Sequence, residues 1–129
     1  MFAAAHHFGA HRRTLVELER ILRPGGHALY LHEPACRRFI HGAARRRVMA
    51  KRPVVPEDVL VPSKLEDLAL AAGLSPQVLR APTTTCRGPV GTMYYYALQR
   101  LPILQKVLPC SVDIIFTKQP SRSQLTDPR

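Results

Sequence analysis

The stretch "RILRPGGHALYLHEP", Arg20 to Pro34, decides the fold class of this chain. Before it, apolar residues recur at helical spacing among charged residues over 13–23, which predicts a surface helix with one buried stripe. Pro24 cannot continue that helix, and Gly25 or Gly26 can adopt the positive φ that closes it. The chain is therefore expected to reverse directly from a helix into a strand.

The strand that follows, residues 27–33, is apolar on both of its faces at its centre. Leu29 and Leu31 alternate there with Ala28 and Tyr30. A strand covered on both faces belongs in a parallel-type sheet with helices on each side. A helix that feeds such a strand is the second half of a βαβ unit, whose first strand would lie in the opening residues "MFAAA". The sequence therefore predicts the α/β class.

Two further helices and a loop are predicted downstream. Residues 36–52 place apolar residues at helical spacing among arginines and lysines, which predicts a basic amphipathic helix. The proline-rich residues 53–62 predict a loop. Ser63 and Glu66 then form the pattern of a capping box, which predicts a helix that begins at Ser63 and that Gly73 ends.

The last third of the chain predicts two more strands around a helix. Residues 76–81 predict a strand, and residues 92–108 a helix that a proline interrupts. Residues 111–119 predict a strand with one apolar face, formed by Val112, Ile114 and Phe116. The polar residues 120–129 predict a disordered tail, so that one domain is expected over 1–119.

Composition limits the class of protein. With 129 residues and 46% apolar content, the chain is expected to form one globular domain. No apolar run reaches the roughly 20 residues that span a bilayer, and three scattered cysteines indicate neither a disulfide framework nor a zinc site. A cytoplasmic protein is therefore expected. The net charge of +10 favours polyanions, and any nucleic-acid binding is expected to be nonspecific.

The order of these elements, with "AAAHHF" before "LVELERILRPGGHALYLHEP", resembles the C-terminal half of a class I S-adenosylmethionine-dependent methyltransferase, in its type 11 branch. In that family the fourth strand often ends in paired histidines. A helix of the form Leu-x-Glu-x-x-Arg-hydrophobic-Leu-Arg/Lys-Pro-Gly-Gly follows. Residues 15–26 match this form, with Glu17 one residue from its commonest position in the family. The resemblance covers roughly 1–119 and is strongest over 6–34. It implies a partial Rossmann-like sheet of strands four to seven with flanking helices and without the first three strands.

The glycine-rich cofactor motif of that family is absent from the sequence. The family places Gly-x-Gly-x-Gly after its first strand and an acidic residue at the end of its second. The seven glycines of this chain form no such cluster. The resemblance therefore implies a parent protein that uses S-adenosylmethionine and methylates a small molecule, with weak or no cofactor binding by this chain. It also implies that Met1 is an internal methionine taken as a start.

The resemblance places the lip of the cofactor pocket at Ala3, Ala4, His6 and His7. His7 is the candidate catalytic base, and a turn histidine that packs on the next helix is the alternative. A metal is not expected, because two adjacent histidines are expected to point in different directions and no carboxylate lies nearby at ligand spacing.

Four residues are candidates for a substrate pocket. Glu33 and Pro34 end the central strand on the side where open α/β sheets bind ligands, although a plain strand-ending charge is an equal alternative. Tyr94 and Tyr95 could contribute to a lid over an apolar substrate, or could instead pack their helix onto the sheet.

A second function class remains open. The chain could be a noncatalytic basic module that binds a partner subunit through an open sheet edge, or nucleic acid through a basic run of Arg45, Arg46, Arg47, Lys51 and Arg52. A solvated helix face is the alternative for the basic run. The apolar edge at residues 2–8 is also expected to promote self-association.

Overall fold

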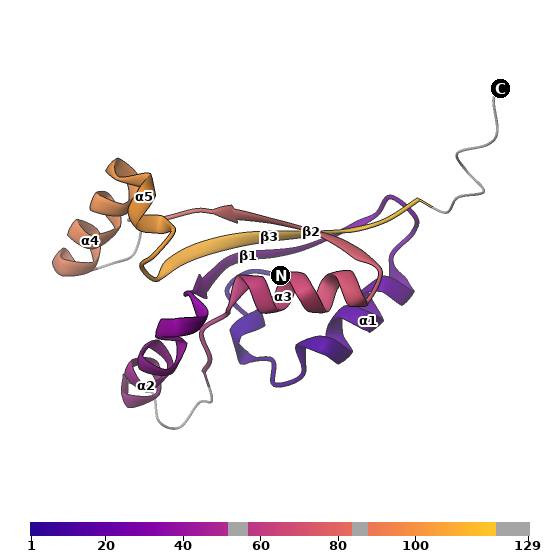
Figure 1. The fold of residues 1–129 in the computed structure, drawn as a ribbon, viewed down its shortest axis with the longest axis horizontal. Coiled ribbons are helices and arrows are strands. Elements are labelled where there is room, and N and C mark those ends of the chain that lie inside the picture. Colours follow the sequence, from indigo (N-terminus) through magenta and orange to yellow (C-terminus); the bar gives the residue numbers. More distant parts are fainter. Residues whose placement is uncertain (52–56, 84–87, 121–129) are drawn as a thin grey trace.

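The computed structural model describes residues 1–51, 57–83 and 88–120 of the chain. Its centre is a three-stranded sheet of β1 (His27–Ala35), β2 (Leu74–Arg80) and β3 (Cys110–Lys118). The strands lie in the order β1-β3-β2, and both neighbouring pairs are antiparallel. The last strand of the chain thus joins the two earlier strands (Figure 1). The residue patterns of the separate strands did not predict this antiparallel pairing.

Two helices cover one face of the sheet. These are α1 (His11–Ile21) and α3 (Pro62–Ala71), which pack against each other beneath the strands in Figure 1. Leu15 from α1 and Leu65 from α3 join a core with the central residues of β3. The predicted apolar face of β3 is confirmed, because its three residues are at most 3% exposed: Val112, Ile114 and Phe116.

The opposite face of the sheet carries no such cover. Leu29 of β1 and Leu79 of β2 are 41% and 44% exposed. The pairing register places both on the face opposite Ile114. The prediction that strand 27–33 is covered on both faces and lies in a parallel-type sheet is therefore wrong for the described part of the chain.

The remaining helices lie at one end of the sheet (Figure 1). A short 3-10 helix η2 (Arg38–Ile40) leads into α2 (His41–Lys51), which confirms a helix in the basic segment. The proline-interrupted helix is also confirmed, as α4 (Pro89–Arg100) and α5 (Pro102–Gln105). Within the described residues, no helix is both long and apolar enough to cross a membrane. Cys86 lies outside the described residues, and so do residues 121–129 of the predicted tail.

Helix α1 ends at Ile21 with an extended Leu22 as its C-cap, and the Arg-Pro-Gly-Gly turn that follows is bonded to the end of β3. Gly25 has φ +75°, a conformation that favours glycine. Its N–H donates to the carbonyl of Lys118 at 2.9 Å, and the N–H of Lys118 donates to the carbonyl of Gly26 at 3.0 Å. The prediction that this turn reverses the chain from a helix into a strand is confirmed.

The predicted capping box at Ser63 is wrong. Helix α3 begins one residue earlier, at Pro62, and its N-cap Val61 makes no side-chain capping bond. Proline suits the first helical position, because its fixed φ is helical and its missing N–H would have no partner inside the helix. Gly73, with φ +85°, follows the last residues of α3 as predicted.

The expected strand in the opening residues is reduced to a single bridge. Phe2 pairs with Leu31 in a parallel bridge, and the N–H of Ala3 donates to the carbonyl of Leu31 at 2.8 Å. The chain then leaves the sheet and forms a 3-10 helix, η1 (Ala5–His7). Within its described residues the structure therefore has three strands where the resemblance implied four, because the N–H groups of residues 4–6 bond to a side chain instead of a strand.

A β-bulge in β1 supplies that side chain. The register shifts between Tyr30 and Glu33, so that Leu31 and His32 together oppose Asp113. His32 has φ +57°, and its N–H donates to Oδ1 of Asp113 at 2.7 Å. A bulge exchanges the faces of all residues after it. Glu33 is thereby placed on the same buried face as Tyr30.

Candidate functional site at the carboxyl end of β1

Glu33 holds the residues that follow the Phe2 bridge. Its side chain is fully buried. Oε1 accepts hydrogen bonds from the N–H groups of Ala4 and Ala5, both at 2.8 Å. Oε2 accepts one from the N–H of His6 at 3.2 Å and lies 2.8 Å from Nδ1 of the His6 ring. One carboxylate thus satisfies three backbone donors and orients one imidazole.

These contacts keep the carboxyl group ionised. Burial raises the pKa of Glu33, but the hydrogen bonds from Ala5, the His6 side chain, Ala4 and the His6 backbone outweigh it, so that its pKa lies below the ordinary value. An anionic carboxylate accepts hydrogen bonds only, so His6 Nδ1 carries the proton in this pair. His6 Nε2 is then the nitrogen with an available lone pair.

The segment around Asp58, which is distant in the sequence, is hydrogen-bonded to His6. The N–H of Asp58 donates to the carbonyl of His6 at 3.1 Å. This bond brings Glu57 beside the two histidines. One ring nitrogen of His6, one of His7 and a carboxylate oxygen of Glu57 lie within 4.8 Å of one another. The three side chains form a potential metal-binding group.

The expectation that no metal binds stays a prediction, although the folded chain brings the two rings and a carboxylate closer together than the local sequence indicated. The His6 and His7 rings do not point apart, because their centroids are 4.1 Å from each other with a 41° tilt. A carboxylate is also present, from Glu57, which is about fifty positions away in the sequence. Nothing in the local pattern of the loop around Glu57 indicated this contact.

A cavity of about 520 Å³ lies beside this group. The N-terminal part of α1, the start of α2 and the start of α3 line it. His41 Nε2 lies 2.9 Å from Oδ1 of Asp58 on its wall. The Nδ1 atom of His11 is buried without a hydrogen-bond partner among the described residues. Burial lowers the pKa of His11 most strongly, ahead of the nearby charges. No pattern in the sequence singled out His41.

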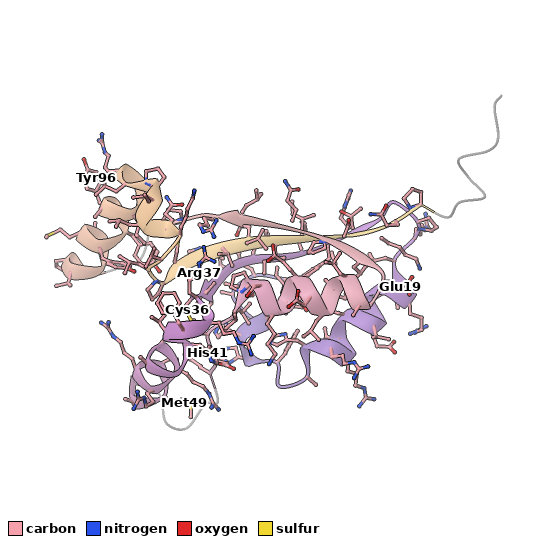
Figure 2. All side chains as sticks on the ribbon, in the orientation of Figure 1. Glu19, Cys36, Arg37, His41, Met49 and Tyr96 are labelled. Atoms are coloured by element: carbon pink, nitrogen blue, oxygen red, sulfur yellow. The ribbon has the colours of Figure 1, made fainter. Side chains whose placement is uncertain are left out.

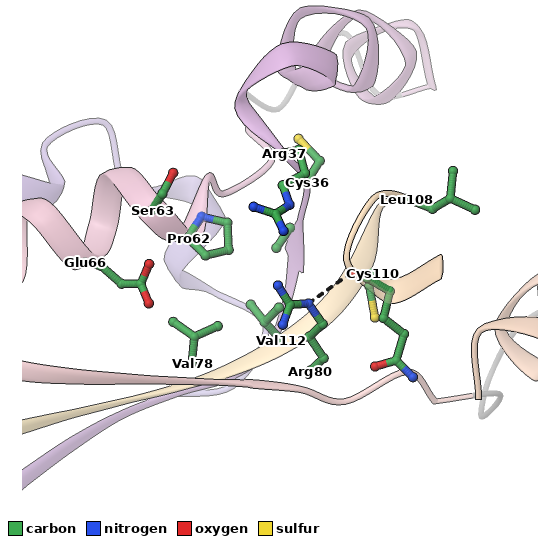
Figure 3. A pocket seen from close by; sticks show the side chains of 12 residues that line it. Cys36, Arg37, Pro62, Ser63, Glu66, Val78, Arg80, Leu108, Cys110 and Val112 are labelled. Atoms are coloured by element: carbon green, nitrogen blue, oxygen red, sulfur yellow. Dashed lines mark hydrogen bonds between the residues drawn. The ribbon is translucent and has the colours of Figure 1, made fainter. Parts of the chain in front are cut away.

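A smaller cavity of about 150 Å³ lies between the end of β1 and α5 (Figure 3). The guanidinium groups of Arg37 and Arg80 are placed by backbone carbonyls, with Nε of Arg80 donating to Gln105 at 2.9 Å and Nε of Arg37 donating to Lys106. Cys36 and Cys110 line it with buried side chains. Burial is the main cause that raises the pKa of Cys36, which disfavours a reactive thiolate.

The predicted site residues fall into two groups. Ala3, Ala4, His6 and His7 lie together with Glu33 at the end of β1. Pro34 stands next to Glu33 in β1, and its carbonyl accepts the N–H of Leu60 at 2.8 Å. Contact of Glu33 or Pro34 with substrate stays a prediction.

Tyr94 and Tyr95 belong to α4, at the end of the molecule where Figure 2 labels Tyr96. The hydroxyl of Tyr94 donates to the carbonyl of Pro109 at 2.6 Å, and the Tyr94 and Tyr95 rings meet edge to face at 5.3 Å. Neither tyrosine lines either of the two cavities described above. The structure thus does not bring them to η1, and their role as a lid stays a prediction.

The structure resembles solved methyltransferases, although no family model and no curated protein matches the sequence. A provisionally assigned sarcosine dimethylglycine methyltransferase from Galdieria sulphuraria superposes with a TM-score of 0.60 and 14% identity, over 92% of this chain and 51% of that protein. The YcgJ protein from Bacillus subtilis superposes with a TM-score of 0.58 and 16% sequence identity, over 92% of this chain and 62% of that protein.

A provisionally assigned methyltransferase from Bacillus halodurans gives a TM-score of 0.56 and 13% identity, over 93% of this chain and 62% of that protein. The chain thus spans between 51% and 62% of the length of these three structures. At such low identity, the likeness concerns the fold. The described residues form a mixed α/β unit whose fold is similar to part of a methyltransferase.

Proposed function

We propose that this chain forms the C-terminal part of an S-adenosylmethionine-dependent methyltransferase domain that methylates a small molecule. The observation that supports this most is the sheet order β1-β3-β2, together with superposition on methyltransferases over 92–93% of the chain. In the proposed correspondence, β1, β2 and β3 are the fifth, sixth and seventh strands of a partial Rossmann-like sheet. The Phe2 bridge is the end of the fourth.

The residues held by Glu33 form the lip of the cofactor pocket in this proposal. Ala3, Ala4, His6 and His7 face the transferred methyl group, and His7 is the candidate base. Glu33 acts on this lip through its hydrogen bonds to residues 4–6. Methyl transfer depends mainly on the alignment of the two reactants and the exclusion of water, so a rigid lip matters more than a strong acid or base.

The residues of this chain do not form a complete cofactor site. The sequence has neither the glycine-rich turn nor the acidic residue that would bind the ribose hydroxyls. The lip alone offers a short stretch of backbone and two imidazoles. We therefore assign the rest of the cofactor site to a protein segment that carries these motifs.

The expected result for the isolated chain is weak or undetectable binding of S-adenosylmethionine and no methyl transfer. The chain of 129 residues lacks the two motifs that hold most of the cofactor. Calorimetric titration is the measurement. The matched experiment uses the protein encoded by any continuous reading frame upstream of Met1, which should contain a glycine-rich turn and bind the cofactor with micromolar affinity. Micromolar binding by the isolated chain, or a stop codon just upstream with a genuine start signal at Met1, would contradict the proposal.

The second candidate is a noncatalytic module that associates through the sheet. The observation that favours it is apolar exposure next to the Phe2 bridge, where Phe2 is 69% and Leu29 41% exposed. An interior strand lacks the charges and prolines that protect natural sheet edges. In this candidate the exposed segment docks onto a partner subunit or a second copy of the chain.

Self-association is the expected behaviour of the isolated chain under either candidate. Light scattering over a range of concentrations should show a rising mean mass, and Phe2→Lys should reduce this rise by placing a charge on the edge. Phe39→Lys is the matched control, because Phe39 is equally exposed, at 75%, but lies in η2. A chain that stays monomeric at all concentrations, or an equal effect of Phe2→Lys and Phe39→Lys, would contradict the open-edge expectation.

Nucleic-acid binding and location are secondary parts of the proposal. Arg45, Arg46 and Arg47 are exposed on α2, and we propose only nonspecific, salt-dependent contacts of these groups with phosphates. A cytoplasmic location is proposed from the sequence composition.

A further inference from the structure

We propose that His6, His7 and Glu57 bind a divalent transition-metal ion of the zinc class. Glu33 orients the His6 ring through its contact with Nδ1. The proposal stands apart from methyl transfer, because it rests on this chain's own residues alone. Its basis is the approach of two imidazole nitrogens and one carboxylate oxygen to within 4.8 Å of one another.

The backbone brings these ligands together without the help of a metal. The carboxylate of Glu33 holds the N–H groups of Ala4, Ala5 and His6. The N–H of Asp58 in turn donates to the carbonyl of His6, at 3.1 Å. The two ligand-bearing segments, from opposite ends of the first half of the chain, are therefore joined next to the ligands. A site joined in this way needs little ordering when an ion binds.

The His6–Glu33 pair has the arrangement of a metal ligand and its supporting carboxylate. Nδ1 of His6 lies 2.8 Å from Oε2 of Glu33. A ligating histidine usually donates its second ring N–H to a carboxylate or carbonyl, which fixes the tautomer and leaves the other nitrogen for the metal. We therefore assign Nε2 of His6 as the ligand atom. Burying the charged side chain of a glutamate beside a histidine costs desolvation free energy, which a turn without a binding role does not require.

The charge distribution also favours a cation here. The chain has only nine acidic residues against nineteen lysines and arginines. Three of those nine, Glu33, Glu57 and Asp58, lie at this one place. Asp58 is offset by His41, at 2.9 Å, and more weakly by Arg45, at 3.9 Å. The carboxylate of Glu57 lies within 4.8 Å of a ring nitrogen of each of the two histidines and would add its negative charge to the binding of a dication.

The donor set selects the kind of metal. Two imidazoles and one carboxylate are a zinc or iron(II) set, whereas magnesium and calcium prefer oxygen ligands. The ligand atoms of a tetrahedral zinc ion are roughly 3.3 Å apart, so the group has to contract from its present 4.8 Å limit. His7 is exposed, and its ring can turn toward the ion without disturbing the core. Three protein ligands leave one position for water or for an oxygen of a bound molecule.

The test is metal binding by the untagged chain of 129 residues, without any methyltransferase substrate. Zn²⁺ affinity is measured by calorimetry, and the visible absorption of Co²⁺ reports the geometry and the ligand type. One ion per chain is expected, with a tetrahedral Co²⁺ spectrum that lacks a thiolate band. Glu57→Gln and His7→Ala should each lower the Zn²⁺ affinity at least about 10-fold, and Glu33→Gln by about 10- to 100-fold.

Matched controls distinguish this site from nonspecific metal binding by any of the six histidines of the chain. His27→Ala removes an exposed histidine that bonds only to Thr117 in the structure, and Glu17→Gln removes an exposed carboxylate on α1. Both variants should keep the full affinity, and circular dichroism should show that all variants retain the fold.

The proposal is overturned if Zn²⁺ does not bind at micromolar concentration, or if binding persists unchanged in Glu57→Gln. It is equally overturned if His27→Ala weakens binding as much as His7→Ala does, or if Co²⁺ shows a thiolate band. Because the assay contains no S-adenosylmethionine, these outcomes leave the methyltransferase proposal to its own test.

Discussion

Replacing Glu33 with alanine is expected to lower the free energy of unfolding by about 3–5 kcal/mol. The buried carboxylate accepts hydrogen bonds from three backbone N–H groups and pairs with the ring of His6. Its removal leaves these buried and partly buried donors without their partner. Urea unfolding followed by circular dichroism measures the loss. Glu17→Ala is the matched control, because Glu17 is 55% exposed in its pair with Arg20 and should change stability by less than about 0.5 kcal/mol.

The same carboxylate predicts a pH dependence. The pKa of Glu33 in the folded chain lies below its unfolded value of about 4.3. A depressed pKa contributes stability that is complete above the unfolded pKa and is lost as the pH falls through the folded one. Between about pH 5 and pH 3, the unmodified chain should therefore lose more stability than Glu33→Gln does. Parallel losses in the two proteins would show that Glu33 is not the titrating group.

The second large effect is expected at Phe116. This residue is fully buried in the central strand β3 and meets the ring of Tyr30 edge to face, with centroids 4.9 Å apart. Phe116→Ala removes a large apolar side chain between the sheet and the two helices that cover it. A loss of about 3–5 kcal/mol is expected, together with a lower midpoint of urea unfolding.

Phe39→Ala is the control for this substitution. Phe39 is 75% exposed in η2, so its removal creates no cavity and should change stability by less than about 0.5 kcal/mol. If Phe116→Ala were no more destabilising than Phe39→Ala, the core of this chain would not lie between the sheet and helices α1 and α3.

Tyr30 packs against Phe116 and is affected by the charge of Glu33. Its hydroxyl group is unusual. Its oxygen is buried without a hydrogen-bond partner among the described residues. Burial, with a smaller contribution from the charge of Glu33, raises its pKa to about 12. The hydroxyl is therefore protonated at neutral pH. It supplies a donor on the same buried face of β1 as Glu33.

Local patterns in the sequence were sufficient for most of the secondary structure. The helix before Pro24, the glycine turn and the strand after it all follow from periodicity and turn chemistry within a few residues. The apolar face of β3 follows from simple alternation. Ser63 was a failure of the same method, because Pro62 competes for the start of the helix and takes its first position.

Strand pairing was beyond the reach of these patterns. A strand with two apolar faces fits a parallel sheet, yet β1 pairs antiparallel with β3, about eighty residues later in the chain. The apolar character of Leu29 and Leu31 indicates burial without indicating a partner. In this structure Leu29 remains 41% exposed.

The candidate site shows most clearly the difference between what local sequence patterns predict and what the tertiary structure decides. The sequence by itself determined that two histidines stand together and that Glu33 and Pro34 belong to the last part of a strand, which the structure extends to Ala35. Only the tertiary structure decided what Glu33 does. Simple alternation places Glu33 on the face opposite Tyr30, and the bulge at Leu31 and His32 reverses this by one residue.

The position of Glu57 was likewise decided by the folded chain. It depends on a hydrogen bond between the backbones of Asp58 and His6, which no side-chain pattern encodes. Turns and helices are set by interactions among neighbouring residues, and therefore leave a local signature in the sequence. Bulges and contacts between distant loops are set by the pairing of remote segments, whose free energy is gained only when the whole sheet and its helices have come together.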